Sequence, residues 1–235
     1  HNLVGSKLYN SIYINLLKKT SLTNAIPSEW ISIFINKGIK VNYFKSYFLL
    51  YLFMFKQLIG ALIYFFKTFI NSFIQLLKFE NKVNFKNSAY LMHLTPINVP
   101  LNNHNRYNIF NWYIREFNED NSIKEIRHSL KNINFEYEGF NCKYSEPIPA
   151  INSLFKILSF LFYFLYTLII SLILALFFNP YYAIFLLEFL KEKHLKLSYD
   201  NNCSKEYLFN NENMIYRPFW TYFAEKKGIK IYLYN

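Results

Sequence analysis

The side chains best suited to chemistry lie near the end of the chain. No arginine other than Arg217 follows Arg127. A guanidinium group at the start of a helix can hold a phosphate or carboxylate through two hydrogen bonds, and the helix dipole adds to the attraction. Arg217 is therefore a candidate anchor for a phosphate or an acidic sugar. The alternative is an ion pair with Glu212 or Glu225, or packing on Trp220.

Three further residues follow Arg217 at helical spacing. Trp220 could stack on the face of a sugar or serve as an apolar core residue. Thr221 and Glu225 lie four residues apart, which places them on one helix face. Glu225 is a weak candidate for a catalytic base that takes a proton from an acceptor hydroxyl, beside the simpler reading of a solvated or paired carboxylate.

Polar residues also follow a predicted strand. Asn210 follows the apolar run 207–209 and Asn213 lies three residues further on, at the end of a strand where α/β folds bind ligands. They complete the predicted substrate-binding set of Asn210, Asn213, Arg217, Trp220 and Thr221. His93 and His104 share one loop, but the sequence suggests no third ligand, so we predict no metal and no cofactor.

A strand–helix–strand unit must position these residues. Residues 207–210 read as a strand, 215–227 as a helix that tolerates Pro218 in its first turn, and 229–234 as a second strand. Gly228 stands where a helix ends in the left-handed conformation. Residues 27–44 follow the same order, with a predicted helix closed by Lys37-Gly38 and a strand at 39–44. Both ends therefore indicate a doubly wound α/β fold.

The middle of the chain alternates apolar and polar stretches. Residues 88–94 and 133–138 are predicted strands, 122–131 a helix, and 139–149 a loop, and Trp112-Tyr113 a short strand or turn.

Two long hydrophobic helical segments interrupt this pattern, at about 47–77 and 154–197. In the first, lysines recur every eleven residues, about three helical turns, and form a slowly drifting stripe at Lys45, Lys56, Lys67 and Lys78. Thr68 and Ser72 are expected near this polar side. An amphipathic helix of this kind lies in a membrane interface or a protein groove. We prefer the in-plane orientation to a full span, and an ordinary core helix is the third alternative.

Residues 157–178 contain no charge and extend about 33 Å, enough to cross a hydrocarbon core. A single crossing would place the two α/β ends on opposite sides of a membrane. An even number of crossings or a shallow re-entrant hairpin removes this conflict, and we favour shallow, monotopic association.

Composition limits the partners. The chain has a formal net charge of +11, supplied mainly by lysine, which favours anionic partners such as anionic lipids or phosphorylated sugar donors. No zinc-finger spacing, RNP-like aromatic box or dense arginine patch indicates nucleic acid. Cys142 and Cys203 form no CxxC motif and fit a reducing compartment.

The stretch KEYLFNNENMIYRPFWTYFAEKKGIKIYLYN resembles a bacterial surface polysaccharide biosynthesis family named for its PFTS motif. The matching residues are Phe209, Asn210, Tyr216, Arg217, Pro218, Trp220, Thr221, Glu225 and Gly228. Phe219 stands where the family has Leu, and the PFTS motif itself is absent. The resemblance covers about the last thirty residues, and the apolar stretch before them fits in character only.

The resemblance implies a glycosyltransferase of two-domain, GT-B type. Residues 1–235 would be its incomplete Rossmann-like, acceptor-side N-terminal domain, with the hydrophobic helices inserted and in contact with a membrane. The protein would move a sugar from a nucleotide-sugar donor to a glycan or lipid-linked acceptor at the cytoplasmic face of the inner membrane. The nucleotide sugar would bind the missing C-terminal domain, so this fragment alone is expected to be inactive. The alternative is a non-enzymatic integral membrane interaction or scaffold subunit.

Overall fold

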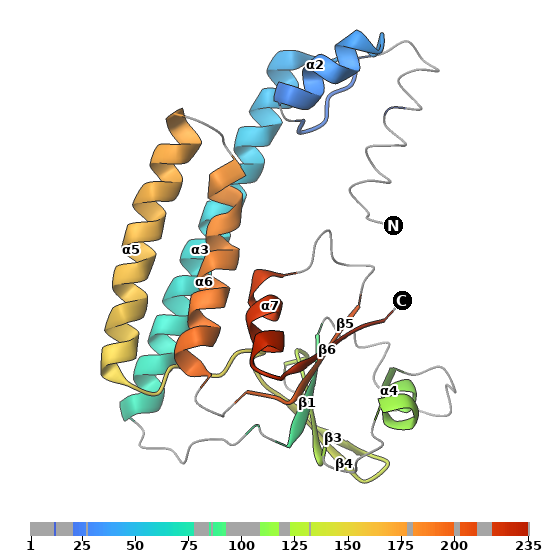
Figure 1. The fold of residues 1–235 in the computed structure, drawn as a ribbon, viewed down its shortest axis with the longest axis vertical. Coiled ribbons are helices and arrows are strands. Elements are labelled where there is room, and N and C mark those ends of the chain that lie inside the picture. Colours follow the sequence, from blue (N-terminus) through green and yellow to red (C-terminus); the bar gives the residue numbers. More distant parts are fainter. Residues whose placement is uncertain are drawn as a thin grey trace. The chain divides into compact units, whose positions relative to one another are not determined.

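The computed structural model describes residues 12, 21–26, 28–77, 85, 87–92, 109–117, 123–131, 133–177, 181–199, 203–210 and 218–234. The chain forms two compact units, one from residues 1–73 and 154–191 and the other from 74–153 and 192–235 (Figure 1). The first unit is helical in its described part. It contains α2 (Ser28–Asn36), most of α3 (Tyr43–Leu77), α5 (Leu154–Phe177) and the beginning of α6 (Tyr181–Ser198).

The second unit is built on a six-stranded, mostly parallel sheet. Its strands are β1 (Ser88–Leu91), β2 (Glu125–His128), β3 (Phe135–Tyr137), β4 (Phe140–Tyr144), β5 (Glu206–Asn210) and β6 (Lys230–Tyr234), in the order β3-β4-β2-β1-β5-β6. β3 alone is antiparallel, paired with β4 as a hairpin at the edge. The mixed α/β class expected from the sequence is confirmed.

Helices cover both faces of the sheet. On one face, α4 (Ile109–Phe117) buries Phe110 and Tyr113 against Leu91, Ile126 and Leu208. On the other face, Trp220 of α7 (Phe219–Lys226) and Leu195 of α6 pack on strand residues Tyr90, Tyr207 and Phe209. Figure 1 shows α4 and α7 on opposite sides of the strands. This explains why all four residues of β1 are buried, since a parallel strand between two layers is covered on both sides.

The two Lys-Gly helix closings have the same geometry. Gly228 has a φ of 80°, its N–H bonds to the carbonyl of Glu225, and the N–H of Ile229 bonds to that of Ala224. Gly38 has a φ of 75° with equivalent bonds to Ile35 and Phe34. Both are Schellman motifs, which satisfy carbonyls that a helix end leaves free. The predicted ends of these helices are confirmed.

Several predicted elements are wrong. The strand expected at 39–44 is reduced to one bridge between Val41 and Leu22, because α3 already begins at Tyr43. The predicted helix 122–131 contains β2, the predicted loop 139–149 contains β4, and Trp112-Tyr113 belong to α4. In each case pairing or packing with distant residues overrides a weak local preference.

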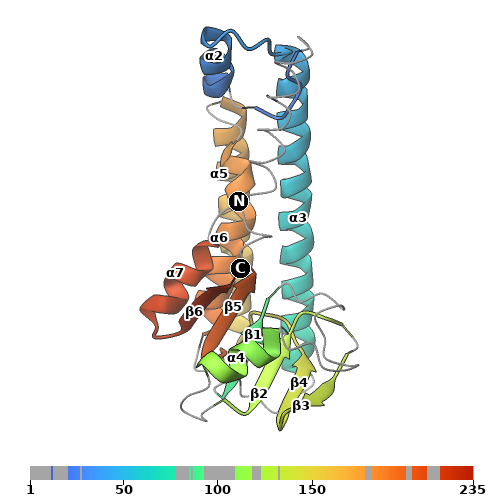
Figure 2. The ribbon, with the colours of Figure 1, turned by 90° about the vertical axis from the view of Figure 1, so that its right-hand side faces the viewer.

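The long helices of the first unit pack through both small and large side chains. α3 and α5 run antiparallel (Figure 2). The ring of Phe65 stacks on that of Phe164 at 3.9 Å between centroids. The buried residues of α3 are Ser46, Leu50, Met54, Ala61, Phe65, Thr68 and Ser72, and those of α5 are Ile157, Phe160, Phe164, Ser171 and Ala175. Exposed apolar side chains include Phe48, Phe55, Ile63, Phe66, Phe155, Phe162, Ile169 and Leu176.

The lysine stripe lies on the outward side of α3. Lys45, Lys56 and Lys67 are exposed, and Lys56 is two residues, about 200° of helical rotation, from buried Met54. The expectation that Thr68 and Ser72 share the lysine side is wrong. Their hydroxyl groups are buried on the opposite side, because that is the side that packs within the helical unit.

Within the described residues, α3 and α5 are long and apolar enough to cross a membrane. Only 22% of the most apolar window of each helix is buried inside the protein. A core helix of a soluble domain would bury most of that window, whereas large exposed apolar surfaces are typical of interaction sites for proteins or membranes.

Two glycine substitutions should shift stability in opposite directions. Gly228→Ala forces an L-residue into a positive φ, although nothing crowds the added Cβ. We therefore expect the free energy of unfolding to fall by about 1–2 kcal/mol. Gly60→Ala, inside α3 and equally uncrowded, should instead stabilise its helix by about 1 kcal/mol. Thermal unfolding followed by circular dichroism in detergent measures both. Equal shifts for the two variants would contradict the Schellman assignment.

Candidate functional site

The carboxyl edge of the sheet is suited to ligand binding where the two central strands β1 and β5 end. β1 ends at Leu91 and β5 at Asn210, side by side, and the N–H of Met92 donates to the carbonyl of Leu208 at 2.9 Å. The chain after β1 leads to α4 on one face, and the chain after β5 leads to α7 on the other. In parallel α/β sheets ligands bind at the carboxyl edge where neighbouring connections diverge in this way.

A short segment that follows β4, residues 145–149, forms a strap held by three buried side chains. The hydroxyl groups of Tyr90 and Tyr207 donate to the carbonyls of Ser145 and Pro147, each at 2.8 Å. His194 Nε2 lies 3.0 Å from the carbonyl of Pro149. Every second carbonyl of the strap is therefore satisfied by a side chain from β1, β5 or α6.

Burial keeps these side chains neutral. Desolvation raises the pKa of Tyr90 and of Tyr207 well above the usual value. It lowers the pKa of His194 to about 4, so the neutral ring donates its Nε2–H to Pro149 at neutral pH. Neutral donors bound to neutral carbonyls fix the strap to the sheet without an ion pair at any of these three contacts.

A second polar group lies where β2 and β4 end. His128 and Tyr144 are register partners on these parallel strands. The His128 ring is fully buried and stacks on Phe135, and burial lowers its pKa. The Tyr144 hydroxyl donates to Glu146 at 2.7 Å, and its pKa is raised to about 12 by burial and by that carboxylate. The sequence reading missed this group because a helix was predicted across His128.

Arg127 on the same strand faces the other side of the sheet. Its guanidinium group lies 3.1 Å from a Glu125 carboxylate oxygen and 3.7 Å above the centre of the Phe85 ring. Burial lowers its pKa and the neighbouring Glu125 raises it. These partners give Arg127 a structural role within the sheet.

The predicted site residues differ in burial and in position. Trp220 is only 2% exposed and its indole contacts the rings of Tyr207 and Phe209, so it has the core role that the sequence left open. Thr221 is fully buried, with its hydroxyl bonded to the carbonyl of Pro218 at 2.7 Å. Glu225 is exposed in the last turn of α7.

The described residues do not bring Glu225 to the carboxyl edge. Its carbonyl accepts the N–H of Gly228, which leads into the start of β6 at the opposite, amino edge. Asn210 ends β5 and pairs in register with Tyr234, while its side chain lies outside the described part. Arg217 and Asn213 also lie outside the described residues, as do His93 and His104.

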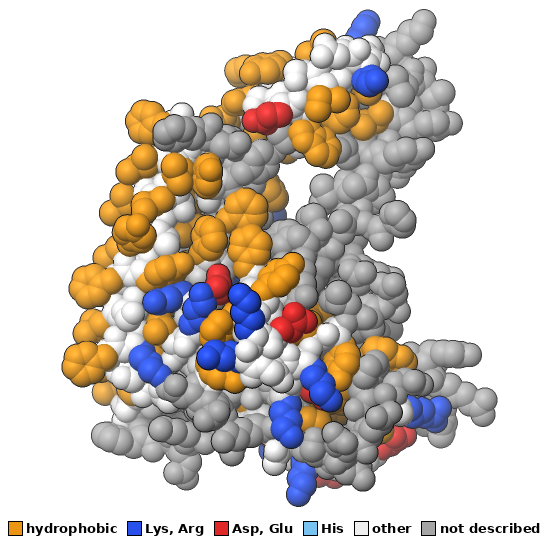
Figure 3. Space-filling model, in the orientation of Figure 1, with side chains coloured by type: hydrophobic (Ala, Val, Ile, Leu, Met, Phe, Trp, Pro, Cys, Tyr) orange, Lys and Arg blue, Asp and Glu red, His pale blue; other side chains and the backbone are white. Residues whose placement is uncertain are grey.

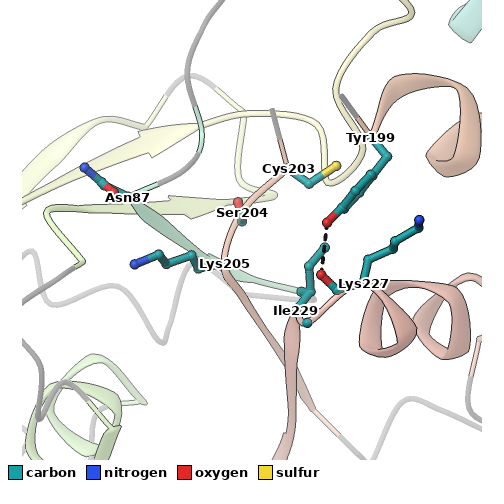
Figure 4. Close-up of a pocket in the computed structure, with 8 residues that line it drawn as sticks. Asn87, Tyr199, Cys203, Ser204, Lys205, Lys227 and Ile229 are labelled. Carbon is teal, nitrogen blue, oxygen red and sulfur yellow. Dashed lines mark hydrogen bonds between the residues drawn. The ribbon is translucent and has the colours of Figure 1, made fainter. Parts of the chain in front are cut away.

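A pocket of about 290 Å³ opens at the amino edge (Figure 4). It is lined by Asn87, Tyr199, Cys203, Ser204, Lys205, Lys227, Gly228 and Ile229. The side chains of Lys205 and Lys227 extend in opposite directions, and burial raises the pKa of the Cys203 thiol to about 12. The thiol stays protonated at neutral pH and is a poor nucleophile. Among the described residues, no three His, Cys, Asp or Glu side chains are grouped to hold a metal.

The strap should make the protein sensitive to mild acid. In the unfolded chain His194 binds a proton with a pKa near 6.5, whereas in the folded chain its pKa is about 4. Between these values the unfolded state binds more protons, so the free energy of unfolding should fall as the pH is lowered from 6.5 to 4, by roughly 3 kcal/mol in total.

Denaturant unfolding of the wild type and of His194→Gln across this pH range tests the assignment. Glutamine retains an N–H donor but does not titrate, so its pH slope should be smaller. The slope that persists is expected from His128, whose pKa burial also lowers. An unchanged slope in His194→Gln would show that the strap histidine is not the titrating group.

No protein family, curated protein or solved structure shows a significant match to this chain. Its function is therefore inferred from the residues and the fold described above.

Proposed function

We propose that this chain is the acceptor-side part of a membrane-associated, glycosyltransferase-like protein of cell-surface polysaccharide biosynthesis. The reaction would transfer a sugar from a nucleotide-sugar donor to a glycan acceptor carried on a lipid. In this proposal the carboxyl edge of the sheet binds the acceptor, and no residue of this chain is assigned to the nucleotide.

The order of the parallel strands carries the proposal. Numbered along the chain, the parallel strands β1, β2, β4, β5 and β6 lie in the order 3-2-1-4-5. This is the order of the doubly wound Rossmann fold, which the sequence resemblance also implies. The order reverses between β1 and β5, where Asn210 ends its strand and the segment leading to Arg217 begins. The fold therefore supports a ligand at the position that the sequence motif marks.

The outward surfaces of α3 and α5 support membrane association. Large apolar side chains cover these surfaces, and small or hydroxyl-bearing residues such as Ser46, Ala61 and Ser171 occur among the buried ones, as they do in helices that meet lipid. The lysines of α3 stand at intervals of about 16 Å, so no uninterrupted apolar length of about 30 Å exists on its outward side. This pattern favours a helix lying in the interface over one that spans the bilayer.

Sheet membership restricts how α5 can enter a membrane. β4 precedes α5, β5 follows α6, and both strands belong to one sheet. A single crossing by α5 would separate them, so α5 and α6 must together cross an even number of times. The apolar first part of α6, residues 181–190, extends only about 15 Å. A shallow, monotopic hairpin satisfies both limits.

The free thiols of Cys142 and Cys203 fit a reducing compartment and hence the cytoplasmic face of the cell membrane, where we place the sheet.

Acceptor binding tests the site. The full chain in lipid nanodiscs should bind a polyprenyl-diphosphate-linked saccharide, and Arg217→Gln should weaken binding by about tenfold or more through loss of a bidentate contact to phosphate. Arg115→Gln, an exposed arginine on α4, is the matched control and should bind like the wild type. If wild type and Arg217→Gln bind equally, or neither binds, the scaffold alternative replaces the enzyme proposal.

The helix pair provides an independent test of membrane association. Ala61→Leu adds a large side chain to the buried side of α3, whereas Ile63→Leu changes its outward side without changing volume. Overpacking in Ala61→Leu should lower the free energy of unfolding by about 1–3 kcal/mol. The conservative change Ile63→Leu at a lipid-facing position should change it little. Both variants should stay with membranes after alkaline carbonate extraction. If carbonate released the wild type from membranes, the outward apolar surfaces of α3 and α5 would be assigned to contact with a protein instead of lipid.

A further inference from the structure

The C-terminal ends of α6 and α7 together form a basic and aromatic patch. Lys196 Nζ lies 5.5 Å from the centre of the Phe223 ring, and Lys227 Nζ lies 5.7 Å from the same ring. Tyr199 meets Phe223 edge to face at 5.9 Å, and its hydroxyl donates to the carbonyl of Lys227 at 2.9 Å. Two segments distant in sequence are thus fixed around one ring.

The patch carries a surplus of positive charge. Residues 192–199 and 219–227 hold four lysines and two glutamates, a net charge of +2. Glu192 pairs with Lys196 at 2.6 Å, while Lys226 and Lys227 are exposed at the end of α7. Figure 3 shows lysine side chains gathered over the end of α6 and over α7. Ammonium groups held around one aromatic ring repel each other, and an anionic surface would neutralise them.

α6 itself connects this patch to an apolar segment. From Tyr181 to Leu190 its only charged residue is Glu188, which is buried and paired with Lys191 at 2.9 Å. From Lys191 onward the helix is rich in charge. Lys196 lies six residues, about 9 Å along the axis, beyond Leu190. The two headgroup regions of a bilayer add about 10–15 Å in total, or about 5–8 Å on each side, so this rise is enough to carry Lys196 from the edge of the hydrocarbon core to the headgroup layer.

We propose that Lys196, Tyr199, Phe223, Lys226 and Lys227 form a docking surface for the anionic headgroup layer of a phospholipid membrane. This inference rests on the proposed membrane association and adds its lipid selectivity. Lysines near a membrane surface are attracted to anionic lipids, and aromatic side chains with polar tips prefer the headgroup level. The patch would hold the sheet unit against the membrane surface independently of the apolar helices.

A fluorescent label beside the patch reports the contact. Tyr222 is 51% exposed and lies one helical turn before Lys226, so Tyr222→Cys accepts a thiol-reactive dye. The native thiols of Cys142 and Cys203 are buried, with pKa values raised to about 12, and should stay unlabelled at neutral pH. The labelled full chain is reconstituted in vesicles that contain a lipid with a nitroxide on its headgroup.

Quenching by the nitroxide should be at least twofold stronger in vesicles containing about one-third phosphatidylglycerol than in pure phosphatidylcholine. High salt and the variant K196Q/K226Q/K227Q should each remove this extra quenching in the phosphatidylglycerol vesicles. The matched control, K124Q/K131Q/K143Q, removes the same amount of charge from exposed lysines of the same unit. It should retain the extra quenching. Circular dichroism confirms that both variants fold.

Equal quenching in the two kinds of vesicle, or equal loss in both triple variants, would overturn the proposal. So would loss of the gain on adding inorganic phosphate but not an equal ionic strength of chloride, since that identifies a free-anion site. Flotation of the chain with each kind of vesicle distinguishes the proposed membrane association of the apolar helices from the proposed lipid contact of the patch. Flotation with phosphatidylglycerol vesicles alone supports the patch without the apolar anchor, and flotation with neither kind contradicts both.

Discussion

The parallel pairing of β1 with β5 is the constraint on which the rest of the structure depends. It joins residues 88–91 to residues 206–210, with Tyr90 opposite Tyr207 in register. The chain between them first adds β2, β3 and β4 on the other side of β1, then leaves the sheet through the apolar helix α5 and α6, and returns as β5. The pairing also creates the point at which the strand order reverses, and so it defines both the candidate site and the permitted membrane topologies.

The strap shows how the same pairing organises the side chains. Tyr90 and Tyr207 lie side by side because their strands do, and their hydroxyl groups then meet carbonyls two residues apart. An unpaired buried tyrosine hydroxyl or carbonyl would cost about 1–3 kcal/mol, so each bond is required once the rings are buried. His194 extends the series from α6. The segment that leads from β4 into α5 is thereby fixed to the sheet before the apolar helix begins.

The proposed enzyme and membrane roles rest on separate observations. Strand order and the position of Asn210 concern the sheet, whereas the outward Phe, Ile and Leu side chains concern the helical unit. The basic patch on α6 and α7 belongs to the sheet unit, yet its chemistry suits a lipid surface. A glycosyltransferase acting on a lipid-linked acceptor needs these properties together, because its acceptor is held at the membrane surface.

The sequence alone determined features that depend on neighbouring residues. The turn at Gly228 closes its helix through bonds from the N–H groups of Gly228 and Ile229 to the carbonyls of Glu225 and Ala224. The length of α5 follows from an uninterrupted apolar run. Only the tertiary structure decided the others. The sequence predicts a helix over β2 because a strand of four residues, paired on both sides, has no long periodic pattern of its own. Trp220 lies in the core, and Thr68 and Ser72 face inward, because the inner side of a helix is set by the surface that packs against it. Long-range pairing and packing therefore decided which polar residues reach the site, since a one-dimensional pattern shows that a face exists but not what it meets.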